Sequence, residues 1–224
     1  MKQLIIVGSG AVAAEVTSYI EDGNIGKDQE LVIKGYIDFE SNIEKYWKHY
    51  DFSKPIIGDI NSYEINEEDN FIVCIGDLQF RLKMINILKQ KEAKFINIIH
   101  PTALISKKSK IGQGNIISPY CSIGPKAMLG DFNIMTEFTI IGHDCTVGTN
   151  NFIGGDGLTG HASLGDNNYL GTKSIVLPHV KIGNNNVIQA GMVVDKSIQD
   201  NTTVFYRYKE QVLAIPKKIN PSLS

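Results

Sequence analysis

Residues 117–148 read ISPYCSIGPKAMLGDFNIMTEFTIIGHDCTVG, and every sixth residue of this stretch is aliphatic. The same spacing continues in both directions and gives fifteen such positions in two blocks, nine of them followed directly by glycine. The first block is Ile105, Ile111, Ile117, Ile123, Leu129, Met135, Ile141, Val147 and Ile153, and the second is Leu164, Leu170, Val176, Ile182, Ile188 and Val194. A six-residue unit cannot bury one aliphatic side chain until neighbouring units stack on it. The period therefore predicts a β-solenoid built from hexapeptides.

The residues around the aliphatic positions fit the tight corners of a narrow prism. Glycine lacks a Cβ and is therefore well suited to the corner that follows each aliphatic residue. Two positions before the aliphatic residue the side chain is usually small, as at Asn115, Cys121 and Ala127. The spacing is regular except between Ile153 and Leu164, where eleven residues stand in place of twelve. We expect a pocket where this off-register segment interrupts the uniform solenoid.

Length, composition and charge limit the kinds of protein and of binding partner that the sequence allows. A chain of 224 residues with 42% hydrophobic content is typical of one or two globular domains. Its net charge of −2 and its lack of a basic cluster argue against nucleic acid as a partner. No apolar run is long enough to span a membrane, and Leu4 to Val7 is too short for a secretory signal, so we expect a cytoplasmic protein. The three cysteines have no CxxC spacing and predict neither a disulfide nor zinc, and no metal is expected.

The residues before the repeat alternate between strand and helix patterns. Leu4 to Val7 reads as a strand, Gly8-Ser9-Gly10 as a tight turn, and Ala11 to Ile20 as a helix. Further strands are expected over Leu31 to Asp38, Phe71 to Gly76 and Phe95 to Ile99, with a helix over Leu78 to Lys91. This alternation predicts a Rossmann-like α/β unit followed by the solenoid, so the fold class is α/β plus all-β.

The glycine turn has two readings. Its Gly-x-Gly-x-x-Ala pattern can bind phosphate at a helix N-terminus, or it can simply let the helix pack tightly on the strand. About a hundred residues are too few for a full dinucleotide site, so a mononucleotide or nucleotide-sugar fits better. Proline at Ile99-His100-Pro101 ends the α/β unit. We therefore predict domains over residues 1–100 and 101–204, and a tail or cap over 205–224.

A set of motifs spread over nearly the whole chain resembles the NeuD/PglD-like sugar acyltransferase family, which includes the sialic acid O-acetyltransferases. The motifs are the Gly-x-Gly turn, Gly35-Tyr36-Ile37-Asp38, Ile75-Gly76-Asp77 with Arg81, His100-Pro101 and Gly142-His143-Asp144-Cys145. The resemblance implies a left-handed parallel β-helix in a homotrimer, with sites between subunits. It also implies acetyl transfer from acetyl-CoA to the amino group of a nucleotide-linked sugar, with uridine diphosphate as the implied nucleotide, in surface glycan assembly.

The same resemblance assigns roles to residues. Acyl transfer needs a base to accept the proton of the attacking atom, and histidine is the usual base at neutral pH. The family's base and its carboxylate helper correspond to His143 and Asp144. The less favoured alternative is that His143 is a solvated corner residue. The implied nucleotide-sugar residues are Gly8, Ser9, Gly10, Asp38, Gly76 and Asp77. For coenzyme A the resemblance implies backbone contacts near Gly154, Gly171 and Ala190. His161, close to the irregular segment, is a further candidate for the acyl pocket, with a surface-loop role as an equal alternative. Tyr206 and Arg207 are candidates for the adenine end by their residue types alone.

Three departures from the family keep other functions open. The family's Gly-Gly-His is replaced by Ala11-Val12-Ala13, and a histidine nine residues after the base is replaced by Phe152. The closing stretch is Phe205-Tyr206-Arg207-Tyr208-Lys209, which could bind the adenine end of coenzyme A or cap the solenoid. One alternative is O-acetylation of a sugar such as sialic acid. The other is a non-catalytic scaffold that binds a nucleotide-sugar.

Overall fold

The computed structural model describes residues 2–22, 31–39 and 49–205. The first of its two parts is a parallel five-stranded sheet with the strand order β3-β2-β1-β4-β5. Its strands are β1 (Lys2–Val7), β2 (Leu31–Asp38), β3 (Ile56–Asp59), β4 (Asp69–Val73) and β5 (Lys94–Phe95), and its helices are α1 (Ala11–Glu21) and α3 (Leu78–Gln90).

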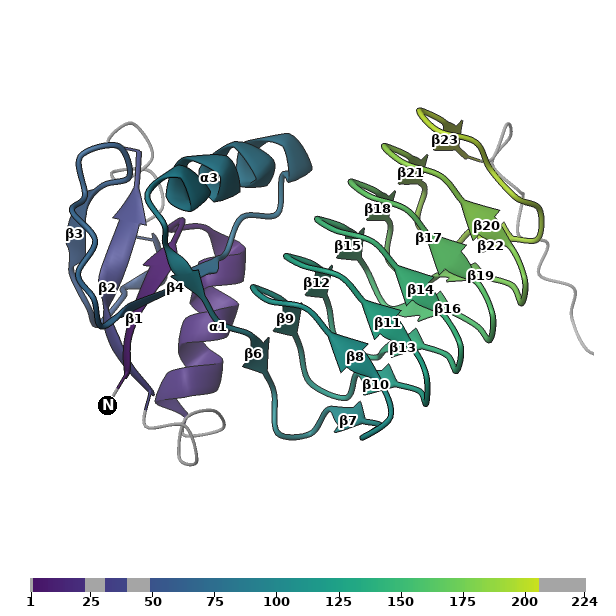
Figure 1. Ribbon diagram of the computed structural model, residues 1–224, viewed down its shortest axis with the longest axis horizontal. Helices are drawn as coiled ribbons and strands as arrows, with labels where there is room; N and C mark the ends of the chain where they lie inside the picture. The colour runs from purple at the N-terminus through teal and green to yellow at the C-terminus, as the bar shows by residue number, and fades with distance from the viewer. Residues whose placement is uncertain (1, 23–30, 40–48, 206–224) are drawn as a thin grey trace, which may run out of the picture.

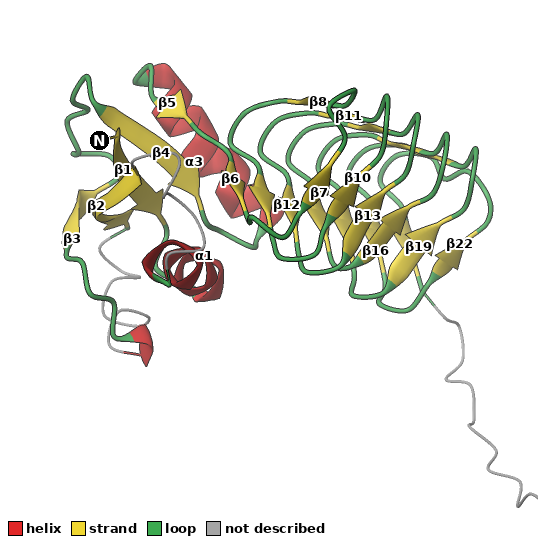
Figure 2. Ribbon diagram, turned by 90° about the horizontal axis from the view of Figure 1, so that it is seen from below, coloured by secondary structure: helices red, strands yellow, loops and turns green. Residues whose placement is uncertain are grey.

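The two helices cover opposite faces of this sheet, because side chains alternate along a strand. Leu4 and Ile6 of β1 pack in one core with Val16 of α1, whereas Ile5 and Val7 pack in another with Met84 and other residues of α3. Figure 2 shows α1 and α3 on the two sides of the sheet. The strand at the centre is therefore buried from both sides, as its continuous apolar run suggests.

The second part is a solenoid with three parallel sheets, which we call faces 1, 2 and 3 (Figure 1). Face 1 holds β7 (Leu104–Ile105), β10 (Ser122–Ile123), β13 (Thr139–Ile141), β16 (Asp156–Leu158), β19 (Ser174–Val176) and β22 (Val193–Val194). Face 2 holds β8 (Lys110–Ile111), β11 (Met128–Leu129), β14 (Thr146–Val147), β17 (Ser163–Leu164) and β20 (Lys181–Ile182). Face 3 holds β6 (Ile98–Ile99), β9 (Ile116–Ile117), β12 (Ile134–Met135), β15 (Phe152–Ile153), β18 (Tyr169–Leu170), β21 (Val187–Ile188) and β23 (Thr203–Val204).

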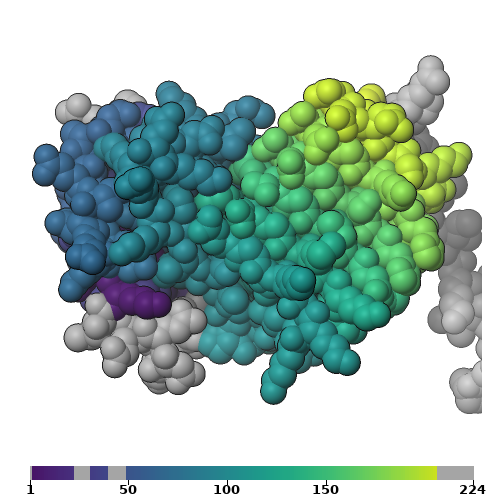
Figure 3. Space-filling model, viewed as in Figure 1, coloured from purple at the N-terminus to yellow at the C-terminus, as the bar shows by residue number. Residues whose placement is uncertain are grey.

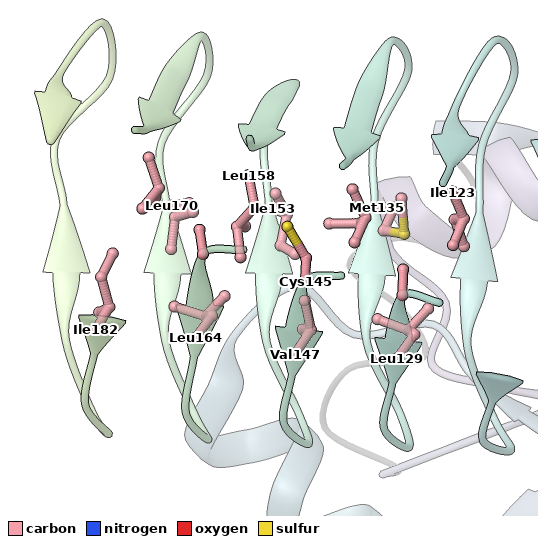
Figure 4. Close-up of a cluster of buried hydrophobic side chains, with 14 of the residues drawn as sticks. Ile123, Leu129, Met135, Cys145, Val147, Ile153, Leu158, Leu164, Leu170 and Ile182 are labelled. Carbon is pink, nitrogen blue, oxygen red and sulfur yellow. The ribbon is translucent and has the colours of Figure 1, made fainter. Parts of the chain in front are cut away.

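The aliphatic positions of the repeat fill the interior of this prism, as the period predicts. Ile123, Leu129 and Met135 come from the three faces of one coil, and all three are buried in a single core. Figure 4 shows such side chains stacked coil upon coil. Most strand pairs join residues eighteen apart, such as Ile123 and Ile141, so one coil takes three hexapeptides.

The irregular segment shortens one coil by a single residue. Pairs on either side of it are seventeen residues apart, for example Ile141 with Leu158 and Val147 with Leu164. Leu158 occupies the missing interior position, and the residue is lost at the corner between β15 and β16. Gly157 there has a φ of +91°, and a Cβ at this position would lie 2.4 Å from the carbonyl oxygen of Ile140. The one-residue shortening of this coil therefore requires glycine at position 157.

Asparagines form a buried ladder along the corner between faces 2 and 3. The Oδ1 atom of Asn133 accepts the backbone N–H of Asn151 at 2.9 Å and its side-chain N–H at 2.9 Å. The backbone bond recurs from coil to coil, and the ladder runs through Asn115, Asn133, Asn151, Asn168 and Asn186. The side-chain bond recurs as far as Asn168, whereas the side-chain nitrogen of Asn186 is buried without a partner. Several of the small positions of the repeat are therefore hydrogen-bonding positions, which satisfy corner amides that would otherwise be buried without partners.

The two parts meet through β6 and Arg81. The sequence predicted one strand over Phe95 to Ile99, which is wrong: the segment forms β5, which closes the first sheet, and β6, which pairs with β9 of the solenoid. The sequence also missed β3, which pairs with β2. Arg81 of α3 is buried and donates to Asn150 and Asn151 of the solenoid. Figure 3 shows the first part packed directly against the early coils.

Within the described residues, no helix is both long and apolar enough to cross a bilayer.

Candidate functional site

The predicted nucleotide-sugar residues gather at the carboxyl ends of the central strands. Gly8, Ser9, Gly10, Asp38, Gly76 and Asp77 all line one cavity of about 400 Å³. Ligands of open parallel sheets bind at this edge, where loops leave neighbouring strands. Gly8 has a φ of +102°, and a Cβ there would lie 2.9 Å from the carbonyl oxygen of Cys74. A Cβ on Gly10, by contrast, would meet nothing within 4 Å, so the turn is open on the cavity side.

The carboxylate of Asp38 holds the glycine turn in place. Its Oδ2 accepts the backbone N–H of Ser9 at 2.9 Å and the Ser9 hydroxyl at 2.7 Å. Its Oδ1 accepts the backbone N–H of Phe39 at 2.7 Å. Both Ser9 and Asp38 are buried. These bonds give Asp38 a structural task beside the base-binding role that the resemblance implies.

The two helix N-termini at this cavity differ in how they are capped. Asp77 caps α3, because its Oδ1 accepts the N–H of Phe80 at 2.7 Å. Helix α1 begins after Gly10 and has no side-chain cap. Gly10, Ala11 and Val12 at this helix start line the cavity, where the helix dipole favours an anion such as phosphate.

A second cavity of about 660 Å³ continues from the first onto the solenoid. The two share Ala11, Val12, Gly76 and Asp77. Its far wall is formed by outward side chains of face 3, including Phe152 and Tyr169, whose rings stack with centroids 5.1 Å apart. In the sequence, Phe152 stood out only as a departure from the family. The aromatic residues at equivalent positions of successive coils were the signal for this wall.

A third cavity of about 730 Å³ lies at the corner where the coil is one residue short. It shares Thr136, Phe152 and Tyr169 with the second cavity and is bounded by Gly154 and Gly155. A pocket at the off-register segment was predicted, and the structure has one. Gly171 and Ala190 follow at the same corner of the next coils, since a Cβ on Gly171 would lie 2.5 Å from the amide nitrogen of Ala190.

His143 and Asp144 lie at a different corner, between β13 of face 1 and β14 of face 2. The Nδ1 atom of His143 and Oδ2 of Asp144 are 2.9 Å apart. The His143 side chain is 55% exposed and that of Asp144 34% exposed. The hydrogen bond from His143, together with the nearby charges of His161 and Lys126, lowers the pKa of Asp144. An ionised Asp144 holds the Nδ1–H tautomer of His143 and leaves Nε2 free to accept a proton.

Two further histidines continue this corner, which we call the histidine corner and define as His143, Asp144, His161 and His179. The rings of His143 and His161 meet edge to face with centroids 5.1 Å apart, and those of His161 and His179 stack at 4.9 Å. Because this coil is one residue short, His161 occupies the position in its coil that Asp144 occupies in the preceding one. The backbone N–H of His161 donates to the carbonyl oxygen of His143 at 3.0 Å.

The sequence-derived residues thus form two groups within one chain. The nucleotide-sugar residues line the first cavity and Gly154 lines the third, with Gly171 and Ala190 at the same corner of the next coils. His161 lies instead beside His143 and Asp144. His143 lines none of the three cavities. Tyr206 and Arg207 lie outside the described residues. His100 is buried at the join of the two parts, where its ring meets that of Tyr19 edge to face, and burial lowers its pKa.

Comparisons with known proteins agree with this architecture. Residues 161–196 match the family described as bacterial transferase hexapeptide (six repeats). PerB from Caulobacter crescentus, solved in complex with CoA and GDP-perosamine, has a TM-score of 0.77 and 24% identity, covering 91% of this chain and 93% of that one. The chain shares the fold of a sugar acetyltransferase. The resemblance seen in the sequence is confirmed at this level, and the solenoid is a left-handed parallel β-helix.

Two more solved structures have the same fold. A histidine-to-asparagine variant of perosamine N-acetyltransferase from Caulobacter crescentus, also in complex with CoA and GDP-perosamine, has 22% identity and a TM-score of 0.76 over 91% of this chain and 93% of that one. The acetyltransferase domain of PglB from Neisseria gonorrhoeae FA1090, in complex with acetyl coenzyme A, has 21% identity and a TM-score of 0.74 over 90% and 95%. Comparison with curated protein sequences gives no match.

Proposed function

We propose that this protein transfers the acetyl group of acetyl-CoA to the amino group of a nucleotide-linked sugar. The observation that carries the proposal is the His143–Asp144 hydrogen bond on a solenoid whose fold matches sugar acetyltransferases. In the reaction, Nε2 of His143 accepts the proton of the attacking amine while the amine nitrogen bonds to the thioester carbonyl carbon. The carbon–sulfur bond then breaks, and coenzyme A leaves as its thiol after taking up a proton.

The first part of the chain would act as a Rossmann-like unit that binds the nucleotide-sugar. Its strand order β3-β2-β1-β4-β5 and the uncapped start of α1 are typical of phosphate-binding sheets. The diphosphate would lie against Gly8 to Ala11, and the sugar would extend along the cavity row toward Phe152 and Tyr169. The nucleotide of the sugar substrate has two candidates. The sequence resemblance implies uridine diphosphate, and the similar structures in complex with GDP-perosamine suggest guanosine diphosphate.

The active site would be completed by a second chain in a homotrimer. Within one chain His143 is separated from the cavity row by a face of the prism, so it can serve a nucleotide-sugar only if another copy brings its own cavity row to the histidine corner. The outer surface of face 1 supplies an apolar contact for this, because Leu104, Ile140 and Val193 are 76%, 47% and 56% exposed. Coenzyme A would then lie between the two copies, at Gly154, Gly171 and Ala190 of one and His161 of the other.

Thiol release from acetyl-CoA tests this function. The purified full chain is incubated with acetyl-CoA and UDP- or GDP-linked sugars that carry either an amino or only hydroxyl groups, and the products are identified by mass spectrometry. Acetylation confined to amino sugars supports the proposal. Acetylation of hydroxyl sugars, including free sialic acid, would replace it with O-acetylation. Tight nucleotide-sugar binding without thiol release from any acceptor would identify a scaffold. An acetyl-CoA-dependent enzyme would also agree with the cytoplasmic location that the sequence predicts.

A further inference from the structure

The histidine corner gathers three ligands of the kind that late first-row metal ions prefer. His143, Asp144 and His161 each offer one ligand atom, and these atoms all lie within 4.8 Å of one another. Two imidazoles and one carboxylate, with room for water, are a common donor set for zinc and for similar ions. The side chains of His143 and Asp144 are part-exposed, so an ion can reach them from solvent.

The separations permit chelation with small side-chain movements. Nδ1 of His143 and Oδ2 of Asp144 are 2.9 Å apart, which suits two ligands that bind one ion at about 2.0–2.1 Å each. His161 approaches from the next coil, with its ring edge to face against that of His143. His179 stacks parallel on the far side of this arrangement, against His161, and is not one of the three residues that can share an ion.

We propose that His143, Asp144 and His161 form a binding site for Zn²⁺ or a similar transition-metal ion, and that the ion inhibits the protein. When Nδ1 of His143 binds the ion, it must give up its proton, and a neutral imidazole then carries its proton on Nε2. Nε2 can no longer accept a proton from an acceptor sugar. The metal therefore locks the imidazole in the tautomer that cannot act as the base, and it also removes the hydrogen bond to Asp144.

Binding is measured first, because it does not depend on activity. The full-length protein, stripped with chelator and free of coenzyme A, is titrated with Zn²⁺ by calorimetry and with Co²⁺ by visible absorption. We expect about one ion per chain and a Co²⁺ spectrum with the intensity of a site of low coordination number. His161→Ala and Asp144→Asn should each weaken binding by about tenfold or more, whereas the matched control His179→Ala should leave it unchanged.

Other outcomes would overturn the site. It is wrong if the protein shows no saturable binding, or if His179→Ala weakens binding as much as His161→Ala does. Equal binding by wild type and His161→Ala would also contradict it. Circular dichroism of each variant separates a lost ligand from a lost fold.

Inhibition is measured second, and this arm rests on the proposed function. Acetylated sugar is quantified directly, because zinc also binds the thiol of the released coenzyme A. Turnover should fall as the metal site fills, with the same midpoint as the titration, and should recover on addition of chelator. Full turnover at saturating metal would contradict the inhibitory role. If no acceptor is acetylated even without metal, the proposed function fails, while the titration still decides the metal site.

Discussion

Gly160 lies against the imidazole of His143, so closely that a Cβ on Gly160 would be 2.6 Å from Nε2 and 2.7 Å from Cε1. The glycine belongs to the next coil, and the His143 ring packs directly against its Cα. Its backbone is outside the left-handed region, so alanine is compatible with its φ. The absence of a side chain at residue 160 therefore sets where Nε2 can be, and Gly160 is a positioning residue for the proposed base.

Gly160→Ala should reduce turnover without unfolding the protein. The added methyl group displaces a part-exposed ring that can rotate away, so we expect a stability change within about 0.5 kcal/mol. Misplacing a base by about 1 Å costs up to roughly a hundredfold in rate, so we expect kcat to fall tenfold or more with little change in KM for the nucleotide-sugar. Steady-state kinetics and thermal unfolding measure both effects.

The matched control for this variant is Gly58→Ala. Its added Cβ would only reach ordinary contact, 3.4 Å from the Tyr63 ring, far from the histidine corner. It should keep wild-type kinetics. An unchanged kcat in Gly160→Ala would show that the contact with Gly160 does not position the His143 ring for catalysis.

Arg81→Ala should loosen the first part of the chain from the solenoid. The buried guanidinium donates to Oδ1 of Asn150 at 2.6 Å and to the carbonyl oxygens of Asn151 and Ile75 at 2.9 and 3.1 Å. Its removal leaves these acceptors without their partner, and we expect a loss of about 3 kcal/mol or more in the free energy of unfolding. Urea unfolding measures this loss, and nucleotide binding should weaken with it.

The control for Arg81 is Lys83→Ala on the same helix. Lys83 is exposed and lies over the Phe39 ring, with Nζ 5.2 Å from its centroid. Its removal should change the free energy of unfolding by no more than about 0.5 kcal/mol. If both variants unfold at the same urea concentration as wild type, the Arg81 bonds contribute nothing to the join.

Acid should weaken the first sheet through Asp69. Burial alone would raise the pKa of this carboxyl, but hydrogen bonds from Lys34, Asn66 and Tyr63 outweigh it and lower the pKa below its ordinary value of 3.8. The folded state then binds the proton less tightly than the unfolded state does. The stabilisation is therefore complete above about pH 4 and is lost as the pH falls through the lowered pKa.

Asp69→Asn tests this pH dependence. The variant should unfold a few degrees below wild type at pH 7, since a buried charge-assisted bond to Lys34 at 2.7 Å is lost. The difference in Tm should shrink as the pH falls below about 4, because wild type then loses the same contribution. A difference that stays constant from pH 7 to pH 2.5 would exclude the charge of Asp69 as its cause.

Local spacing was sufficient to predict the solenoid but not its connections. Fifteen interior positions could be read from the sequence, because one aliphatic side chain per hexapeptide must point inward. Leu158 was not among them, because the short coil displaces it from the six-residue spacing. The strand over Phe95 to Ile99 was misread, since nothing in five apolar-rich residues marks the change from one sheet to another. The asparagine ladder was visible only as small residues, although the eighteen-residue spacing of Asn115, Asn133 and Asn151 carried the signal.

For the candidate site, too, the sequence identified residues but not how the fold arranges them. The family motif located His143 and Asp144, and the structure adds the hydrogen bond that adjacent residues do not guarantee. The sequence could not tell which corner faces which cavity, because that depends on how three faces close into a prism. A regular eighteen-residue coil would place His161 directly over His143, whereas the one-residue slip places it over Asp144, with its ring edge to face against that of His143.

His143→Ala tests the central claim most directly. With a saturating nucleotide-linked amino sugar and acetyl-CoA, its turnover should fall by about a hundredfold or more, since a general base typically contributes that much. His179→Ala, two coils further along the same corner, should stay within about threefold of wild type. If His143→Ala acetylates the sugar at a rate near that of wild type, another group takes the proton and the account of the active site is wrong.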